Sequence, residues 1–156
     1  MFDVVTIGSA TRDGFFKVNF EIIPWSKTPS SKGYLLPLGE KLEVEDVFFT
    51  IGGNAVNASV TFSRQGFKTA CIAKTGCDVS GEELRRRLKK EGVDIKLLAC
   101  TPKKPTAYSV LLLGGGERTI LGYHGASDTF TIRDLDLKKL KSKWWYLSLA
   151  GESDRM

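Results

Sequence analysis

Short apolar segments alternate along this chain with segments of helical periodicity, and this alternation excludes most folds. The segments with the length and composition of buried strands are residues 4–7, 69–73, 93–98 and 144–149. Apolar residues recur at helical spacing in 54–65, 80–91 and 131–141. Strands that alternate with helices form βαβ units, in which the strands run parallel and both faces are covered. The sequence therefore predicts an α/β fold with a parallel sheet.

Two of the predicted helices have clear boundaries. The helix over 54–65 is followed by Gly66, a residue typical of helix ends. Ser80 and Glu83 have the spacing of a capping box, and Gly92 follows the last apolar position. We therefore expect Ser80 to cap the second helix and Gly92 to end it.

Other segments do not fit the alternation and predict a small second sheet. Residues 108–113 and 117–123 flank three glycines and predict a β-hairpin. These glycines are not expected to bind phosphate, because neither Lys-Ser/Thr nor a helical pattern follows them. Residues 15–20 and 44–51 predict further strands, the first of them half-exposed. Residues 21–41 are rich in proline and glycine and predict a loop or a pair of ragged strand ends.

The chain is basic, with a formal net charge of +5 and an isoelectric point near 9.1. Its basic clusters, at 85–90 and 138–143, are interleaved with leucines, as on the solvated face of an amphipathic helix. No aromatic residues alternate with them, so nucleic-acid binding is not expected. No apolar run has the length of a membrane helix, and no signal-peptide pattern precedes the first strand. These features predict a soluble cytoplasmic protein with no membrane partner.

The three cysteines, Cys71, Cys77 and Cys100, have no CxxC spacing and no histidine nearby. Neither a zinc site nor a redox motif is therefore predicted. Cys71 lies in an apolar segment and is expected to be a small core residue. The single histidine, His124, is expected to flank the hairpin, with a substrate contact as the alternative.

Residues 52–57 combine a glycine pair with an asparagine one turn into a predicted helix. Gly52 and Gly53 carry no side chains that would keep a ligand away from the helix N-terminus, where the dipole favours polar or negative groups. The Asn57 amide can donate to and accept from hydroxyls. Asp13 is expected in the loop of residues 8–13 that follows the first strand, at the edge where parallel sheets bind ligands. Its carboxylate can accept from two neighbouring hydroxyls. The set suits a sugar.

Purely structural roles are the alternatives for these residues. Gly52 and Gly53 could form only a tight turn, Asn57 could be a buried amide bonded to the backbone, and Asp13 could cap a turn. A dinucleotide site is excluded, because residues 8–10 lack the G-x-G-x-x-G spacing and no helical pattern follows them.

The order and spacing of several motifs, over essentially the whole chain, resemble the N-terminal signature of the ribokinase-like (PfkB) carbohydrate kinases. The motifs are the first strand with Gly8 and Asp13, Gly52-Gly53-Asn54-Ala55-Val56-Asn57, Arg64-Gln65-Gly66, Lys74-Thr75-Gly76-Cys77-Asp78 with Gly81, Gly92-Val93, and Thr106 before the hairpin with Gly116-Glu117-Arg118-Thr119. The resemblance implies that residues 1–156 are the N-terminal part of a doubly wound α/β kinase domain. It also implies a small β-sheet lid, formed by residues 14–51 and 107–124.

By this resemblance, Asp13, Gly52, Gly53 and Asn57 hold hydroxyl groups of a sugar or nucleoside. Two positions depart from the family pattern. Asn54 stands where several relatives have a lysine, and Thr11 stands where an asparagine is frequent. The resemblance therefore does not identify the sugar.

The catalytic motif of this family is absent from the 156 residues. In the complete enzymes a downstream Gly-Ala-Gly-Asp motif supplies the catalytic base, and the same half forms most of the ATP pocket. Phosphoryl transfer depends on positioning and on electrostatic stabilisation of the phosphoryl oxygens. We therefore expect ATP and Mg²⁺ to serve the complete enzyme, and this chain alone to bind neither strongly and to be inactive. No catalytic residue is assigned.

The predicted strand over 144–149 would be a central strand of the complete sheet, so its apolar edge would either aggregate or dock a partner. Three arrangements stay open: a fragment of a longer kinase, a half complemented in trans by a separate C-terminal half, and a homodimer formed through the lid. The alternative function is a non-catalytic sugar-binding or partner-docking module.

Overall fold

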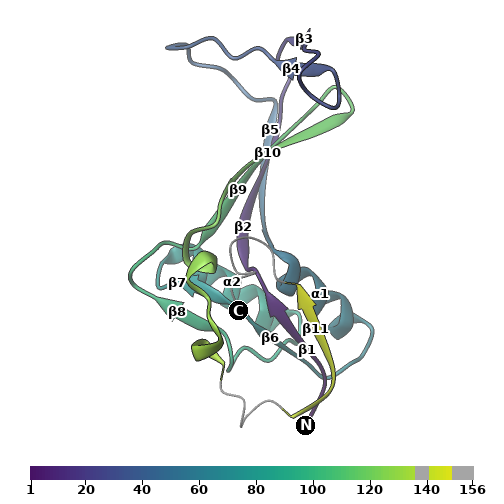
Figure 1. The fold of residues 1–156 in the computed structure, drawn as a ribbon, viewed down its shortest axis with the longest axis vertical. Coiled ribbons are helices and arrows are strands. Elements are labelled where there is room, and N and C mark those ends of the chain that lie inside the picture. The colour runs from purple at the N-terminus through teal and green to yellow at the C-terminus, as the bar shows by residue number, and fades with distance from the viewer. Residues whose placement is uncertain (136–140, 149–156) are drawn as a thin grey trace.

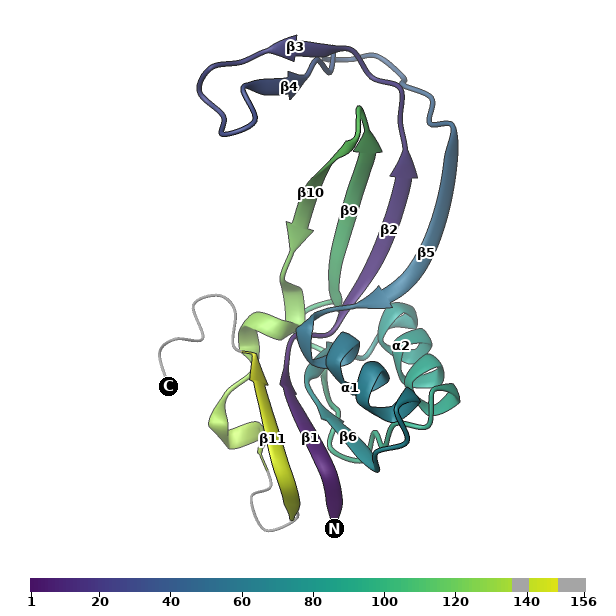
Figure 2. The same cartoon turned by 90° about the vertical axis from the view of Figure 1, so that its right-hand side faces the viewer.

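A parallel sheet is the centre of the body in the computed structural model, which describes residues 1–135 and 141–148 (Figure 1). Its strand order is β11–β1–β6, with bounds of Ser142–Ser148, Phe2–Gly8 and Thr69–Ile72. Two helices, α1 (Asn54–Arg64) and α2 (Val79–Lys90), lie on one side of this sheet (Figure 2). The 3₁₀ helices η1 (Gly125–Thr129) and η2 (Ile132–Asp134) lie on the other side.

Each face of this sheet has its own hydrophobic core. The core under the helices contains Cys71, Ala73, Val56, Leu84 and Leu88. The opposite core contains Val5, Ile7, Ala70, Ile72 and Phe130. Neighbouring residues in a strand point to opposite faces, so β6 contributes Cys71 to one core and Ile72 to the other. The predicted parallel sheet, covered on both faces, is confirmed.

A second, four-stranded sheet, which we call the lid, projects from the body (Figure 2). Its strand order is β10–β9–β2–β5, with bounds of Glu117–Tyr123, Ala107–Gly114, Thr11–Lys17 and Asp46–Gly52. The two central strands, β2 and β9, run parallel, and each outer strand pairs antiparallel with its neighbour. The predicted hairpin is thus present as β9 and β10. The first lid strand begins at Thr11, earlier than the sequence predicted.

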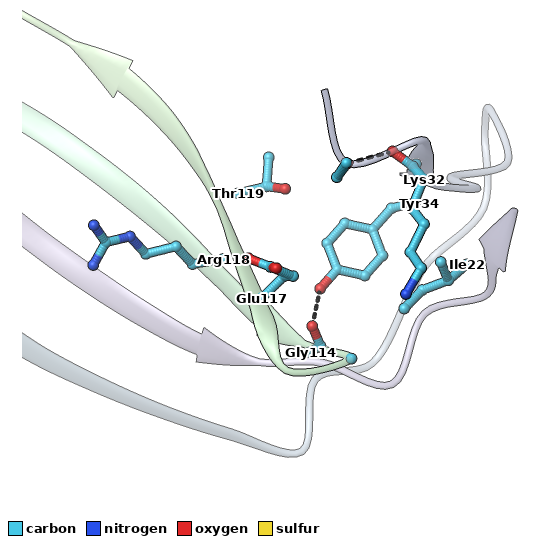
Figure 3. A pocket seen from close by; sticks show the side chains of 10 residues that line it. Ile22, Lys32, Tyr34, Gly114, Glu117, Arg118 and Thr119 are labelled. Carbon is cyan, nitrogen blue, oxygen red and sulfur yellow. Dashed lines mark hydrogen bonds between the residues drawn. The ribbon is translucent and has the colours of Figure 1, made fainter. Parts of the chain in front are cut away.

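An arm formed by residues 18–45 extends from the far end of the lid and contains the short hairpin β3 (Ile22–Pro24) and β4 (Lys32–Tyr34). The Tyr34 hydroxyl donates to the Gly114 carbonyl at 2.9 Å and fastens the arm to the β9–β10 turn (Figure 3). A small cavity of about 120 Å³ lies between the two hairpins. The segment predicted as a loop or ragged strand ends is therefore a hairpin attached to the lid.

A short parallel pair, β7 (Lys74–Gly76) and β8 (Ala99–Thr101), lies beside the lid on the body. The sequence predicted a strand over residues 93–98, and that prediction is wrong, because this segment makes only an isolated bridge between Ala70 and Asp94. The Asp94 carboxylate accepts the Lys96 N–H at 2.8 Å, which turns the chain. The buried Val93 and Leu98 belong to the core without forming a strand.

The predicted cap of the second helix, Ser80, is also wrong. Helix α2 begins at Val79, and its cap is Asp78, whose carboxylate accepts the Gly81 N–H at 2.8 Å. Of the helix predicted over 131–141, the structure shows the turn Ile132–Asp134, and residues 136–140 lie outside the described residues. No helix in the described part of the chain is long and apolar enough to cross a membrane.

Candidate functional site

Asp13 lies within strand β2, at the root of the lid, and not in a loop as the sequence suggested. The sheet register places it opposite Thr50 of β5 and Ser109 of β9, so three polar side chains form a row on one face. Burial raises the pKa of the half-buried Asp13 carboxyl above its ordinary value of 3.8, and the Ser109 hydroxyl opposes this shift. The neighbouring Arg12 pairs with Glu83 instead, so the row holds a carboxylate with unused acceptor capacity.

Gly52, the last residue of β5, provides the space that the Asp13 carboxylate occupies. A Cβ at Gly52 would overlap Oδ2 of Asp13, and the backbone there is buried. Only glycine therefore lets the carboxylate lie against this strand end. The structure thus brings together two of the residues that the sequence singled out.

Gly53 connects the lid to helix α1 in a left-handed conformation, with φ of 93°. A Cβ there would lie 2.5 Å from the Ser9 carbonyl oxygen, so the residue also packs against the β1–β2 connection. The Asn54 N–H donates to Ser9 Oγ at 3.0 Å. Gly53 offers no side-chain cap, and no acidic residue lies in the first turn. The positive end of the helix dipole therefore faces the root of the lid without a carboxylate of its own helix to compensate it.

Asn57 is exposed on α1, which contradicts the alternative that it is a buried, backbone-bonded amide. It lines a cavity of about 290 Å³ together with Thr50, the residue opposite Asp13 in the sheet. The cavity continues along α1 past Thr61 to Arg64, which is paired with Glu91. Thr50 is the one residue of the polar row that lines this cavity, and Asp13 and Ser109 do not line it.

Ser109 and Thr50 are candidate site residues that the sequence did not predict. Neither stands in a recognisable motif, and only the register of β9 and β5 against β2 brings them to Asp13. His124 follows β10 and is exposed, as predicted for a residue that flanks the hairpin.

The cysteines divide into a buried thiol and a disulfide. Burial raises the pKa of the Cys71 thiol to about 11, against the effect of the Thr6 and Ser59 hydroxyls, so Cys71 is the inert core residue that was predicted. Cys77, the residue after β7, and Cys100, the central residue of β8, form a disulfide with Cα atoms 5.4 Å apart. Their spacing in sequence gave no indication of this bond.

The arrangement of body and lid matches solved kinases of the ribokinase fold. A nucleoside kinase of Methanocaldococcus jannaschii, an archaeal member of the ribokinase family, gives a TM-score of 0.74 over 97% of this chain and 46% of its own, at 15% identity. The ribokinase of Arabidopsis thaliana, solved with ribose and ATP, gives 0.66 over 80% of this chain and 36% of its own, at 20% identity. These likenesses define the fold as ribokinase-like.

Sequence comparison then identifies the family. The profile of the pfkB family carbohydrate kinases matches residues 23–151, and the chain belongs to this family. An uncharacterised sugar kinase of Pyrococcus horikoshii is 35% identical over 86 residues, which are 54% of this chain and 28% of that protein. Its structure gives a TM-score of 0.65 over 86% of this chain and 38% of its own, at 26% identity. The chain thus spans less than half the length of these relatives.

Proposed function

We propose that this chain is the sugar-holding part of an ATP-dependent kinase that phosphorylates a hydroxyl of a sugar or nucleoside in the cytoplasm. One observation carries the proposal: the half-buried Asp13 carboxylate lies against Gly52, beside Ser109, with no cation paired to it among the described residues. A carboxylate kept in that setting is suited to accept hydrogen bonds from two neighbouring hydroxyls. Family membership makes a sugar the natural donor of these bonds.

Each of the four candidate residues has a distinct part in this proposal. Asp13 accepts from the hydroxyls, and Gly52 leaves room for its carboxylate. Gly53 brings the N-terminus of α1 to the substrate without a side chain in between. Asn57 adds a donor and an acceptor one turn further along the helix. Substrate binding would therefore join residues of the lid to residues of the body.

The described residues do not fit the nucleotide and the metal. ATP, when bound to the complete enzyme, supplies the phosphoryl group, and Mg²⁺ balances its charge. No group of three or more His, Cys, Asp or Glu side chains in residues 1–135 and 141–148 is arranged to hold a metal ion. The triple glycine forms the β9–β10 turn of the lid and does not open a helix. We therefore derive binding, and not transfer, from this chain.

Titration calorimetry with D-ribose and with adenosine tests the proposal, because a ribokinase and a nucleoside kinase are among the solved relatives. We expect residues 1–156 to bind one of them with measurable heat. ADP release in the presence of ATP–Mg²⁺ should stay at the level of a blank. Sugar-dependent ADP release that disappears in an Asp13→Asn preparation would show that the chain is catalytic. That result would contradict the expectation that residues 1–156 bind the sugar without transferring a phosphoryl group to it.

A second candidate function, docking of a protein partner, rests on the exposure of apolar side chains. In β11 the side chains of Trp145 and Leu147, which point to the same face, are 43% and 62% exposed. On one face of the lid, Phe48 and Ile120 are 53% and 49% exposed. Patches of this kind mark interfaces. We propose that the β11 face meets a C-terminal half, in the same chain or in trans, and that the lid face meets a second copy.

Sedimentation velocity separates these two surfaces. Phe48→Ser should convert a discrete dimer of residues 1–156 to monomer, whereas Leu147→Ser should leave the dimer intact. Polydisperse aggregate in wild type and in both variants would contradict both interfaces. A dimer that Leu147→Ser disrupts would assign the self-association to β11 and not to the lid.

A further inference from the structure

The N-terminal end of α2 contacts the two central strands of the lid. The Asp78 carboxylate, which caps the helix, also accepts the Thr106 N–H at 2.8 Å and the Thr106 hydroxyl at 2.6 Å. Thr106 is the residue immediately before β9. One turn further along α2, Glu83 lies 3.9 Å from Arg12 of β2. Both β9 and β2 are therefore tied to the same helix of the body.

The contact between Asp78 and Thr106 is closely packed and buried. The Thr106 hydroxyl accepts the Gly76 N–H at 3.0 Å while donating to Asp78, and Thr106 is 3% exposed. A Cβ at Gly76 would lie 2.5 Å from the Thr106 nitrogen, and one at Gly81 would overlap the Gly76 carbonyl oxygen. This packing gives a physical reason for glycine at both positions around Asp78.

Asp78 keeps its charge in this setting. Burial alone would raise the pKa of its carboxyl, but hydrogen bonds from Thr106 and Gly81 outweigh burial and hold the pKa below its usual value. Hydrogen bonds to an ionised acceptor are among the strongest in proteins. The tie to β9 is thus present throughout the neutral pH range.

The chain itself gives little resistance to rotation of the lid on the body. Where β5 passes into α1, the two residues at the crossing are Gly52 and Gly53. Where β1 passes into β2, the crossing begins at Gly8. Glycines allow a wide range of backbone angles, so these crossings can act as pivots. A further contact, the Ala126 N–H to the Pro105 carbonyl at 2.8 Å, holds the segment before β9 from the opposite side.

We propose that Asp78 is a positioning residue, which fixes the angle of the lid and thereby holds Asp13 in place relative to Gly53 and Asn57 of the body. Asp13, Thr50, Gly52 and Ser109 lie in one sheet and move together. Gly53 caps α1 and Asn57 lies in it, so the distances between these two residues and the four lid residues depend on the angle between lid and body. The proposal rests on the proposed sugar site, but it makes a claim about the ligand-free protein as well.

The test uses Asp78→Ser, because serine caps a helix about as well as aspartate but is too short to reach Thr106. Spin labels on Glu117→Cys in the lid and Lys90→Cys in α2 report the lid angle by pulsed electron resonance. The labels attach selectively, since Cys71 is buried and Cys77 is bonded to Cys100. Asp94→Ser is the matched control, because the Asp94 carboxylate accepts the Lys96 N–H in a turn of the body, beside Ala70. Thr106→Ser is the conservative control, because it keeps the hydroxyl that donates to Asp78.

We expect a narrow distance distribution in wild type, Asp94→Ser and Thr106→Ser, and a broad one in Asp78→Ser. Ribose or adenosine should bind about tenfold more weakly to Asp78→Ser, a typical coupling between separate sites. An unchanged distribution in Asp78→Ser overturns the positioning role. A broad distribution with unchanged affinity overturns the link to the site. If wild type binds neither probe, the proposed function fails, and the distance distribution alone decides whether Asp78 sets the lid angle.

Discussion

Replacing Asp13 by asparagine is expected to abolish sugar binding while leaving the fold at least as stable as wild type. The substitution removes the charge that accepts the hydroxyl hydrogen bonds, each worth about 1.5–3 kcal/mol when the acceptor is ionised. Loss of two such bonds weakens binding by about 100-fold or more. Titration calorimetry with the sugar that wild type binds measures the affinity, and thermal melting measures the stability.

The expected stability follows from the direction of the pKa shift. Burial raises the pKa of Asp13 in the folded protein, so the folded state holds the proton more tightly than the unfolded chain does. The contribution of this group to stability is therefore largest below pH 3.8 and is lost as the pH rises through the folded pKa. At neutral pH the ionised carboxylate costs stability, and asparagine removes that cost. Sugar binding has the opposite pH dependence, because it needs the carboxylate.

Asp46→Asn is the matched control for this prediction. Asp46 lies in β5 of the same sheet, is exposed, and bonds only to the neighbouring Val47 N–H at 2.8 Å among the described residues. The Asp46→Asn variant should bind the sugar with the affinity of wild type. An Asp13→Asn variant that keeps wild-type affinity would refute the assignment of the site. A variant that loses both affinity and several degrees of melting temperature would show a structural role for Asp13 instead.

Loss of the Cys77–Cys100 disulfide is expected to have the largest effect on stability. The bond joins residues 23 positions apart, and a closed loop of about this length stabilises a fold by about 3 kcal/mol through the entropy of the unfolded chain. At roughly 2–4 °C per kcal/mol for a chain of this size, the Cys77→Ser, Cys100→Ser double variant should melt about 10 °C lower. Differential scanning calorimetry measures the shift.

A dithiol reductant provides the control for this second prediction. Both disulfide cysteines are exposed, so the reductant should lower the melting temperature of wild type to that of the double variant and leave the variant unchanged. The buried Cys71 should not respond. Disulfides are rare in reducing compartments, so the reduced sample also gives the stability that the protein would have in the cytoplasm. Equal melting of wild type and variant without reductant would contradict the prediction.

The parts of the fold that the sequence could predict are those with local signals. The glycine pair and the stop at Gly66 located α1 to within one residue, and the triple glycine located the β9–β10 turn. The start of α2 could not be predicted in this way, because Asp78 and Ser80 are equally good caps on their own. Only the bond from Asp78 to Thr106, 28 positions away, distinguishes them.

The candidate site shows the same division between local and long-range information. Asp13, Gly52, Gly53 and Asn57 stand in motifs and could be proposed from the sequence, although Asp13 was expected in a loop. Ser109 and Thr50 could not, because they reach Asp13 only through the register of β2 with β9 and with β5. The disulfide likewise depends on the β7–β8 pairing, which no local pattern indicated.

The polar row and the arm lie at opposite ends of the lid, and this separation affects how the protein can vary. The arm begins after Lys17 of β2 and ends at Glu45, just before β5. Lys17 and Glu45 form an ion pair at 2.9 Å, at the end of the β2–β5 pairing. Closing a longer loop costs only slightly more free energy, and exposed loop ends accept insertions well. Residues 19–44 can therefore be lengthened, exchanged or fused to a reporter without moving Asp13. The arm thus offers an attachment point, for evolution and for protein engineering, that lies away from the candidate site.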